Sequence, residues 1–149
     1  MPTLATVLVH PDVTNRSGYR YQFTPKHHGG EPNAAMWLPE LSLISEFSIF
    51  NRADLWQIAD SRRWLYGVLP DGNGDLQTIG TWDEQVAEFQ TGPPTDAWHG
   101  YPKWALEETG PPNRRKQQCC PERIVFDQMV AVGMITKIQR KRLLTGRPA

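Results

Sequence analysis

Apolar and polar residues alternate in several short stretches of the chain, and this spacing predicts strands. Tyr19–Phe23 places three aromatic rings on one face and two polar side chains on the other, as a half-buried strand does. Thr3–Val9 consists mainly of residues that favour strands. Trp64–Leu69 and Leu76–Thr81 flank a polar run at 70–75, which predicts a hairpin with its tip there. These stretches together predict a small antiparallel sheet.

Other stretches predict short helices or fit both a helix and a strand. The apolar residues of Leu41–Phe50 fit both period two and one face of a helix, and we favour a strand. Asn51 is then expected to cap a short helix over Arg52–Ala59. Thr81 followed by Glu84 has the spacing of a capping box, which predicts a further helix directly after Thr81.

The last thirty residues predict a pair of helices joined by a turn. Pro121 suits the start of the first helix, and Gly133 suits its end. Thr136 is expected to cap a second helix over Lys137–Leu144, which Gly146 ends. The first helix carries an apolar stripe of Ile124, Val125, Phe126, Met129 and Val132. The predicted fold class is α+β: a small antiparallel sheet with short helices and a C-terminal helix-turn-helix hairpin.

Charge divides the chain into two parts, although the 149 residues carry no net charge. Residues 1–109 contain seven basic and fourteen acidic residues, for a charge of −7, and residues 110–149 contain nine and two, for +7. We expect an α+β core over 1–109 and a basic helical hairpin over 110–149 that docks on it, as a single domain overall. The alternative is a basic surface for nucleic acid or an acidic partner.

The aromatic cluster between residues 98 and 104 is the candidate binding site. It has two interpretations: a pocket wall for a ligand, or an irregular segment anchored in the core. The wall would consist of Trp98, His99, Tyr101 and Trp104. The chain has no nucleophile motif, phosphate-binding loop or dinucleotide fingerprint, so no cofactor is expected and enzymatic activity is not favoured.

Basic residues form a second candidate surface, and metal binding is not expected. The basic residues are Arg114, Arg115, Lys116, Lys137, Arg140, Lys141 and Arg142, which either contact phosphates or form a solvated face. The polar run at 71–75 resembles the start of a calcium loop, but the sixth and twelfth positions are Leu76 and Trp82. His27–Gly30 lacks the spacing of a metal site and predicts a surface loop.

The expected location is the cytoplasm. No apolar run has the length of a membrane span or a signal peptide. Cys119 and Cys120 are neighbours, so a disulfide between them would be strained, and two thiols suit a reducing compartment. The size of the chain suggests a bacterial protein of the kind encoded on mobile gene cassettes.

The leading functional hypothesis is a non-enzymatic accessory protein that binds a protein partner or itself, with no membrane contact. Two alternatives stay open. One is a nucleic-acid-binding protein that uses the basic hairpin, and the other is a small-molecule binder or enzyme with a pocket around His99.

Overall fold

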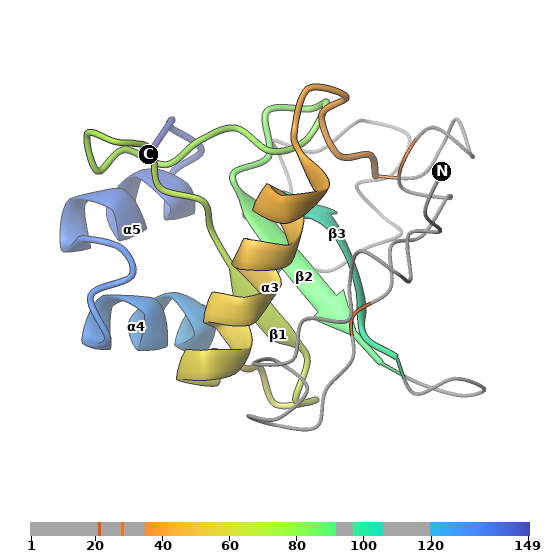
Figure 1. The fold of residues 1–149 in the computed structure, drawn as a ribbon. Coiled ribbons are helices and arrows are strands. Elements are labelled where there is room, and N and C mark those ends of the chain that lie inside the picture. Colours follow the sequence, from red (N-terminus) through yellow and green to blue (C-terminus); the bar gives the residue numbers. More distant parts are fainter. Residues whose placement is uncertain (1–20, 22–27, 29–34, 92–96, 106–119) are drawn as a thin grey trace.

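The computed structural model describes residues 21, 28, 35–91, 97–105 and 120–149. Within them the elements are α3 (Leu43–Trp56), β1 (Leu65–Gly67), β2 (Val86–Gln90), β3 (His99–Lys103), α4 (Arg123–Ala131) and α5 (Lys137–Leu144) (Figure 1). The strands form one antiparallel sheet in the order β1-β2-β3. The predicted fold class, α+β with a small antiparallel sheet and a C-terminal pair of helices, is confirmed. In this part of the chain, no helix has the length and hydropathy of a membrane span.

Two hydrophobic cores lie on opposite faces of the sheet, because successive residues of a strand point to opposite sides. The first core joins Phe50 of α3 to Phe89 of β2. The second core joins Val86 of β2 to Phe126 and Met129 of α4. Figure 1 shows α3 running across the sheet, with α4 and α5 as a pair beside it. The sheet is therefore the middle layer of three.

The stretch 41–50 is helical from Leu43 onward, so the preferred strand is wrong. Ser42 caps α3, and its hydroxyl oxygen accepts a hydrogen bond from the Ser45 backbone N–H at 3.0 Å. The helix then continues through Asn51, which was expected to cap a later helix, and ends at Trp56. The apolar residues of this stretch fit the period of a strand and that of a helix. The stretch is a helix because its apolar face, which includes Ile49, is buried against the sheet.

The helix expected after Thr81 is also wrong, because Val86–Gln90 is the central strand β2. The carboxylate of Glu84 does accept a backbone hydrogen bond, from Trp82 at 2.6 Å, but this bond closes a tight turn. Consecutive residues of β2 are buried on both faces. A central strand, with β1 and β3 on either side, is buried in this way. This burial outweighs the local capping signal.

The segment 97–106, expected to be irregular, contains the strand β3. Its register pairs Phe89 of β2 with Gly100 and Ala87 with Pro102. Glycine and proline both disfavour strands, which hid the pattern in the sequence. Proline is nevertheless compatible with a strand at the edge of a sheet, and β3 is an edge strand of the described sheet.

The predicted chain reversal at residues 70–75 is present, although the strand before it is short and the run after it forms isolated bridges. Pro70 pairs with Leu76 as an antiparallel bridge. The Gln77 N–H donates to the Leu69 carbonyl at 2.8 Å. Asp71 Oδ1 accepts hydrogen bonds from two backbone N–H groups of the turn, at 2.7 and 3.0 Å. The carboxylate thus organises the turn itself.

This turn gives a direct test of the metal prediction. We expect millimolar calcium to leave the melting temperature of the full chain unchanged, because a ligand raises it only when it binds the native state. Removing the Asp71 carboxylate, in Asp71→Ala, should cost about 1 kcal/mol through the lost hydrogen bonds. Differential scanning calorimetry with calcium and with a chelator measures both. A rise of several degrees in calcium would show that the turn binds the ion.

The C-terminal hairpin follows its sequence signals closely. Thr136 and Gln139 form a reciprocal capping box, and α5 covers the predicted Lys137–Leu144. Gly133 has a φ of +76°, which suits the end of a helix. The apolar stripe is only partly buried: the residues in the second core are Val125, Phe126 and Met129, whereas Ile124 and Val132 are exposed.

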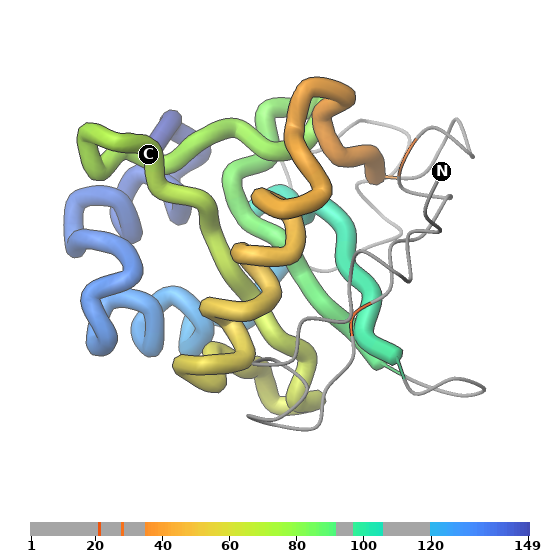
Figure 2. The backbone as a smooth tube through the Cα atoms, in the orientation of Figure 1, coloured from red at the N-terminus to blue at the C-terminus, as the bar shows by residue number. Residues whose placement is uncertain are grey.

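The end of the chain returns to the turn at 70–77, as Figure 2 shows. The Leu76 N–H donates to the Ala149 carbonyl at 3.2 Å. The boundary expected at residue 109 lies outside the described residues, as do the expected strand at 3–9, most of that at 19–23, and Cys119. The domain division and the state of the cysteines therefore stay predictions.

Candidate functional site

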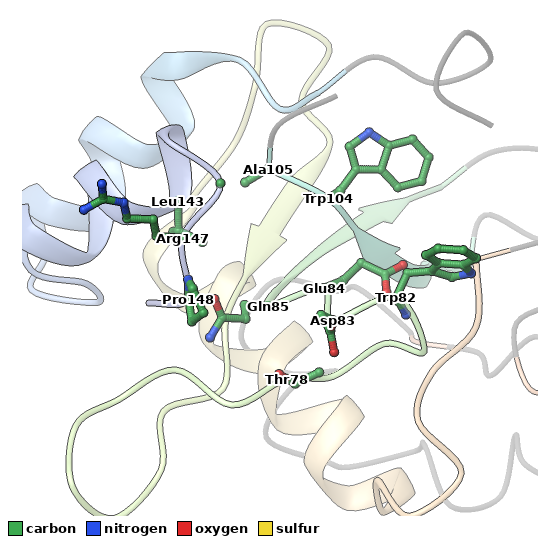
Figure 3. Close-up of a pocket in the computed structure, with 11 residues that line it drawn as sticks. Thr78, Trp82, Asp83, Glu84, Gln85, Trp104, Ala105, Leu143, Arg147 and Pro148 are labelled. Carbon is green, nitrogen blue, oxygen red and sulfur yellow. Dashed lines mark hydrogen bonds between the residues drawn. The ribbon is translucent and has the colours of Figure 1, made fainter. Parts of the chain in front are cut away.

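A cleft of about 450 Å³ opens between the turn that precedes β2 and the C-terminal segment (Figure 3). The turn and the residues that lead into β2 form one side of it, the residues after β3 contribute to its wall, and the end of α5 with the following residues forms the other side. The lining residues are Thr78, Trp82, Asp83, Glu84, Gln85, Trp104, Ala105, Leu143, Gly146, Arg147 and Pro148. The volume lies within the range of pockets that bind small molecules.

A tight turn places Trp82 at the cleft. The Glu84 carbonyl accepts hydrogen bonds from the backbone of Ile79 at 2.7 Å and of Gly80 at 3.3 Å. The Glu84 side chain accepts the Trp82 N–H, and Asp83 adopts a left-handed backbone with a φ of +63°. Aspartate tolerates this conformation better than most residues. The result is a large ring that stays 50% exposed.

Hydrogen bonds also hold the opposite side of the cleft in place. The Ala149 N–H donates to Gln85 Oε1 at 2.9 Å, and Gln85 Nε2 donates to the Leu76 carbonyl at 2.8 Å. The Arg147 N–H donates to the Arg142 carbonyl at 2.8 Å, just after α5 ends. Gln85, the residue before β2, therefore links the turn side of the cleft to the end of the chain, and this fixes the two sides relative to each other.

The wall of the cleft is aromatic and acidic. Trp104 is only 2% exposed and Glu84 only 3%, whereas Asp83 is exposed. Arg147 also contributes to the wall, but Figure 3 shows its guanidinium directed away from Asp83 and Glu84. Across the described residues, no group of three or more His, Cys, Asp or Glu side chains could hold a metal ion.

The four residues of the predicted pocket wall lie in different environments. Trp98 packs in the first core, with ring centroids 6.0 Å from Phe50. Tyr101 is buried in a polar network, His99 is half-buried at the start of β3, and Trp104 alone lines the cleft. Alternation along the strand separates Trp98 from Tyr101, whereas Trp104 follows the end of β3 and lies at the cleft.

Tyr101 belongs to a network centred on the buried carboxylate of Glu88. Glu88 accepts hydrogen bonds from the hydroxyls of Tyr66 and Tyr101, both at 2.5 Å, and from Gln90 at 2.6 Å. Lys103 Nζ lies 3.3 Å from the same carboxylate. Burial raises the pKa of Glu88, but the Lys103 charge and the hydrogen bonds outweigh it, so this pKa lies below its ordinary value. The network is a satisfied, buried part of the sheet.

A second buried carboxylate, Glu46 of α3, has a pKa that is shifted in the opposite direction. Its oxygens are 2.6 Å from His28 Nε2 and 2.8 Å from the Tyr21 hydroxyl, which donates to it. Burial raises the pKa of Glu46, and the interactions with His28 and Tyr21 offset only part of this rise. This cluster ties two residues of the N-terminal part to α3.

The basic residues predicted as a surface are partly described. Lys137, Lys141 and Arg142 are exposed on α5. Arg140 forms an ion pair with Asp127 of α4, with Nε 2.8 Å from Oδ1. Arg114, Arg115 and Lys116 lie outside the described residues, so the basic surface stays a prediction.

Sequence reasoning named Trp104, which lines the cleft, but it did not name three other lining residues, Trp82, Asp83 and Glu84. In the sequence, Trp82 stands between the supposed capping residue Thr81 and two carboxylates. This pattern was interpreted as the start of a helix, so it was not considered as part of a site. The cleft also depends on residues near the end of the chain, and pattern analysis cannot bring such distant segments together.

Comparison of the chain with protein-family models, with curated proteins and with solved structures found no match. The role of the cleft is therefore argued from its own residues.

Proposed function

We propose that this chain is a non-enzymatic accessory protein that binds a protein partner through the cleft beside Trp82. The observation that carries the proposal is the half-exposed indole of Trp82 at a concave site lined also by Trp104 and Leu143. Tryptophan is enriched among the residues that dominate binding energy, because it buries a large apolar area with few rotatable bonds.

The chemistry of the lining residues supports binding over catalysis. The lining residues, all of them described, include no Ser, Cys, His or Lys. These are the residue types that most often act as nucleophiles or general bases. The Glu84 carboxylate is engaged by the Trp82 backbone, so it has a structural task in the turn. A site of this kind suits recognition of a projecting side chain.

A matched pair of tryptophans tests the proposal, because Trp56 is 52% exposed but does not line the cleft. Peptides selected from a random displayed library on the immobilised full chain should lose about tenfold or more in affinity on Trp82→Ala, as interface tryptophans do. The same peptides should bind Trp56→Ala as they bind the unmodified chain. Fluorescence anisotropy of labelled peptides measures both affinities, and thermal melts of both variants check their folding.

Two results would contradict the proposal: a selection that enriches no peptide, or enriched peptides that bind all three proteins equally. Self-association is the other form that the partner can take. A rise in molecular mass with concentration in sedimentation experiments, abolished by Trp82→Ala, would identify a second copy as that partner.

The setting of this function is proposed on composition. The neighbouring cysteines support a reducing compartment, hence the cytoplasm, and the chain size supports a bacterial accessory protein of the gene-cassette kind. Nucleic-acid binding is the alternative, supported by the exposure of Lys137, Lys141 and Arg142. It would show affinity for duplex DNA that falls steeply with salt.

A further inference from the structure

We infer that α4 covers an edge of the sheet with the side chains of Gln128 and Glu122, and so prevents this edge from pairing with a second copy of the chain. The edge is the segment 58–61, which runs antiparallel to β1 on its outer side. Figure 1 shows α4 lying next to the chain that leads from α3 to β1. The inference goes beyond the proposed function, because no residue of this contact lines the cleft.

The segment pairs with the chain at β1 through alternate residues. The Tyr66 N–H donates to the Ile58 carbonyl at 2.9 Å. The Asp60 N–H donates to the Trp64 carbonyl at 3.1 Å. In an antiparallel pair, the residue between two such bonds directs its own N–H and C=O away from the neighbouring strand. The backbone groups of Ala59 therefore face outward, toward the place of a further strand.

Side chains of α4 bond these outward groups. Gln128 Oε1 accepts the Ala59 N–H at 2.8 Å, and Gln128 Nε2 donates to the Ala59 carbonyl at 3.0 Å. A side-chain amide carries the same donor and acceptor as a peptide group, so Gln128 pairs with Ala59 as a residue of a strand would. Glu122 accepts the Ser61 N–H at 2.8 Å and the Ser61 hydroxyl at 2.6 Å. It stands at the N-cap of α4, but its side chain bonds Ser61 and does not cap the helix.

Without this cover, the edge would favour association. The outward N–H and C=O groups of an edge pair readily with another strand. Apolar side chains are also exposed nearby in the chain: Leu55 and Trp56 precede the segment, and Ile124 lies one turn of α4 from Gln128. In a solution of the pure chain, the strand available for pairing is that of a second copy. Movement of α4 away from the edge would offer that copy backbone groups and apolar surface together.

The test replaces Gln128 by methionine, which has a similar length and helix propensity but cannot bond the Ala59 backbone. The loss of two hydrogen bonds should raise the population with an uncovered edge about tenfold. Sedimentation velocity should therefore show association of Gln128→Met at a concentration at least tenfold lower than for its parent chain. All proteins in the test carry Trp82→Ala, so association through the cleft does not contribute and the result does not bear on the proposed function.

Ile49→Val is the matched control, because it loosens the first core and leaves the edge unchanged. It should associate no more than the parent chain. Gln128→Glu is a second variant, for use also if Gln128→Met does not fold. Its carboxylate can accept the Ala59 N–H but cannot donate to the Ala59 carbonyl, so its association should lie between those of Gln128→Met and the parent chain.

Hydrogen exchange of the Ala59 amide identifies the contact in the associated form. This amide should exchange at least tenfold more slowly in associated Gln128→Met than in its monomer, because the second copy supplies an acceptor. Association that leaves the Ala59 amide unprotected would overturn the inference, since apolar side chains alone would then join the copies. Equal association of Gln128→Met and Ile49→Val, or no association of either Gln128 variant, would overturn it as well.

Discussion

Replacing Gly100 by alanine is expected to lower the free energy of unfolding by about 3 kcal/mol, at the upper end of the cost of overpacking a core. Gly100 is the cross-strand partner of Phe89. A Cβ at this position would overlap the Cδ1 and Cε1 atoms of the Phe89 ring and lie 3.1 Å from the Glu88 carbonyl oxygen. Phe89 cannot easily move away, because it is fully buried and its ring packs against those of Tyr21 and Phe50.

Urea unfolding of the full chain measures this cost, and two further variants control it. Gly72→Ala should be close to neutral, since a Cβ there has no heavy atom within 4 Å. Phe89→Leu should reduce the additional cost of Gly100→Ala, because the smaller side chain makes room for the methyl group. If Gly100→Ala unfolded at the same urea concentration as the unmodified chain, the close packing of β2 on β3 would be wrong.

The C-terminal hairpin shows which parts of this fold the sequence predicts well. Thr136, Gln139 and Gly133 act within a few residues of the chain, so a capping box or a left-handed glycine can be recognised without knowledge of the fold. The burial of the first helix was predicted less well. Ile124 belongs to the apolar stripe but is exposed, because the contacts of α4 with the sheet fix which side of the helix is covered.

Strands β2 and β3 show where sequence patterns fail. A strand is stabilised by partners that lie far away in the chain, and local signals can point elsewhere. Thr81 and Glu84 have the spacing of a helix start, yet the burial of β2 on both faces requires a central strand. Gly100 disfavours a strand by itself, but it is the residue that allows the Phe89 ring to lie over β3.

The candidate site was predictable only in part for the same reason. Trp104 was among the predicted residues, and it lines the cleft. Its companions Trp82 and Leu143 come from segments that meet only in the folded chain. No pattern within either segment indicates that meeting, so the cleft had to be found from the structure.

Replacing the buried carboxylate of Glu88 by an amide, in Glu88→Gln, should lower the free energy of unfolding by about 3–5 kcal/mol, the usual cost of breaking a buried ion pair. The change leaves the ammonium of Lys103, which is also buried, without its counter-charge. It also weakens the hydrogen bonds that two tyrosine hydroxyls donate to Glu88. Asp127→Asn is the matched control, because it breaks an ion pair with Arg140 that is largely exposed, and it should cost at most about 1 kcal/mol.

The pH dependence of unfolding distinguishes Glu88 from the other buried glutamate, Glu46. The pKa of Glu88 is lowered in the folded chain, so its contribution to stability is fully present above the ordinary glutamate pKa and is lost as the pH falls through the lower, folded value. The pKa of Glu46 is raised, so its contribution has the opposite sign: it is fully present below the ordinary value and is lost as the pH rises through the folded one.

Urea unfolding across the acid range should therefore give two difference curves with opposite slopes. The stability of the unmodified chain relative to Glu88→Gln should increase as the pH rises, because only the unmodified chain gains the paired carboxylate. Its stability relative to Glu46→Gln should decrease at higher pH, between the ordinary glutamate pKa and the raised folded value, because only the unmodified chain must bury the Glu46 charge. Parallel curves would contradict this prediction. They would show that burial and the paired groups affect the pKa of the two carboxylates alike, and that the Lys103 contact does not stabilise the ionised form of Glu88.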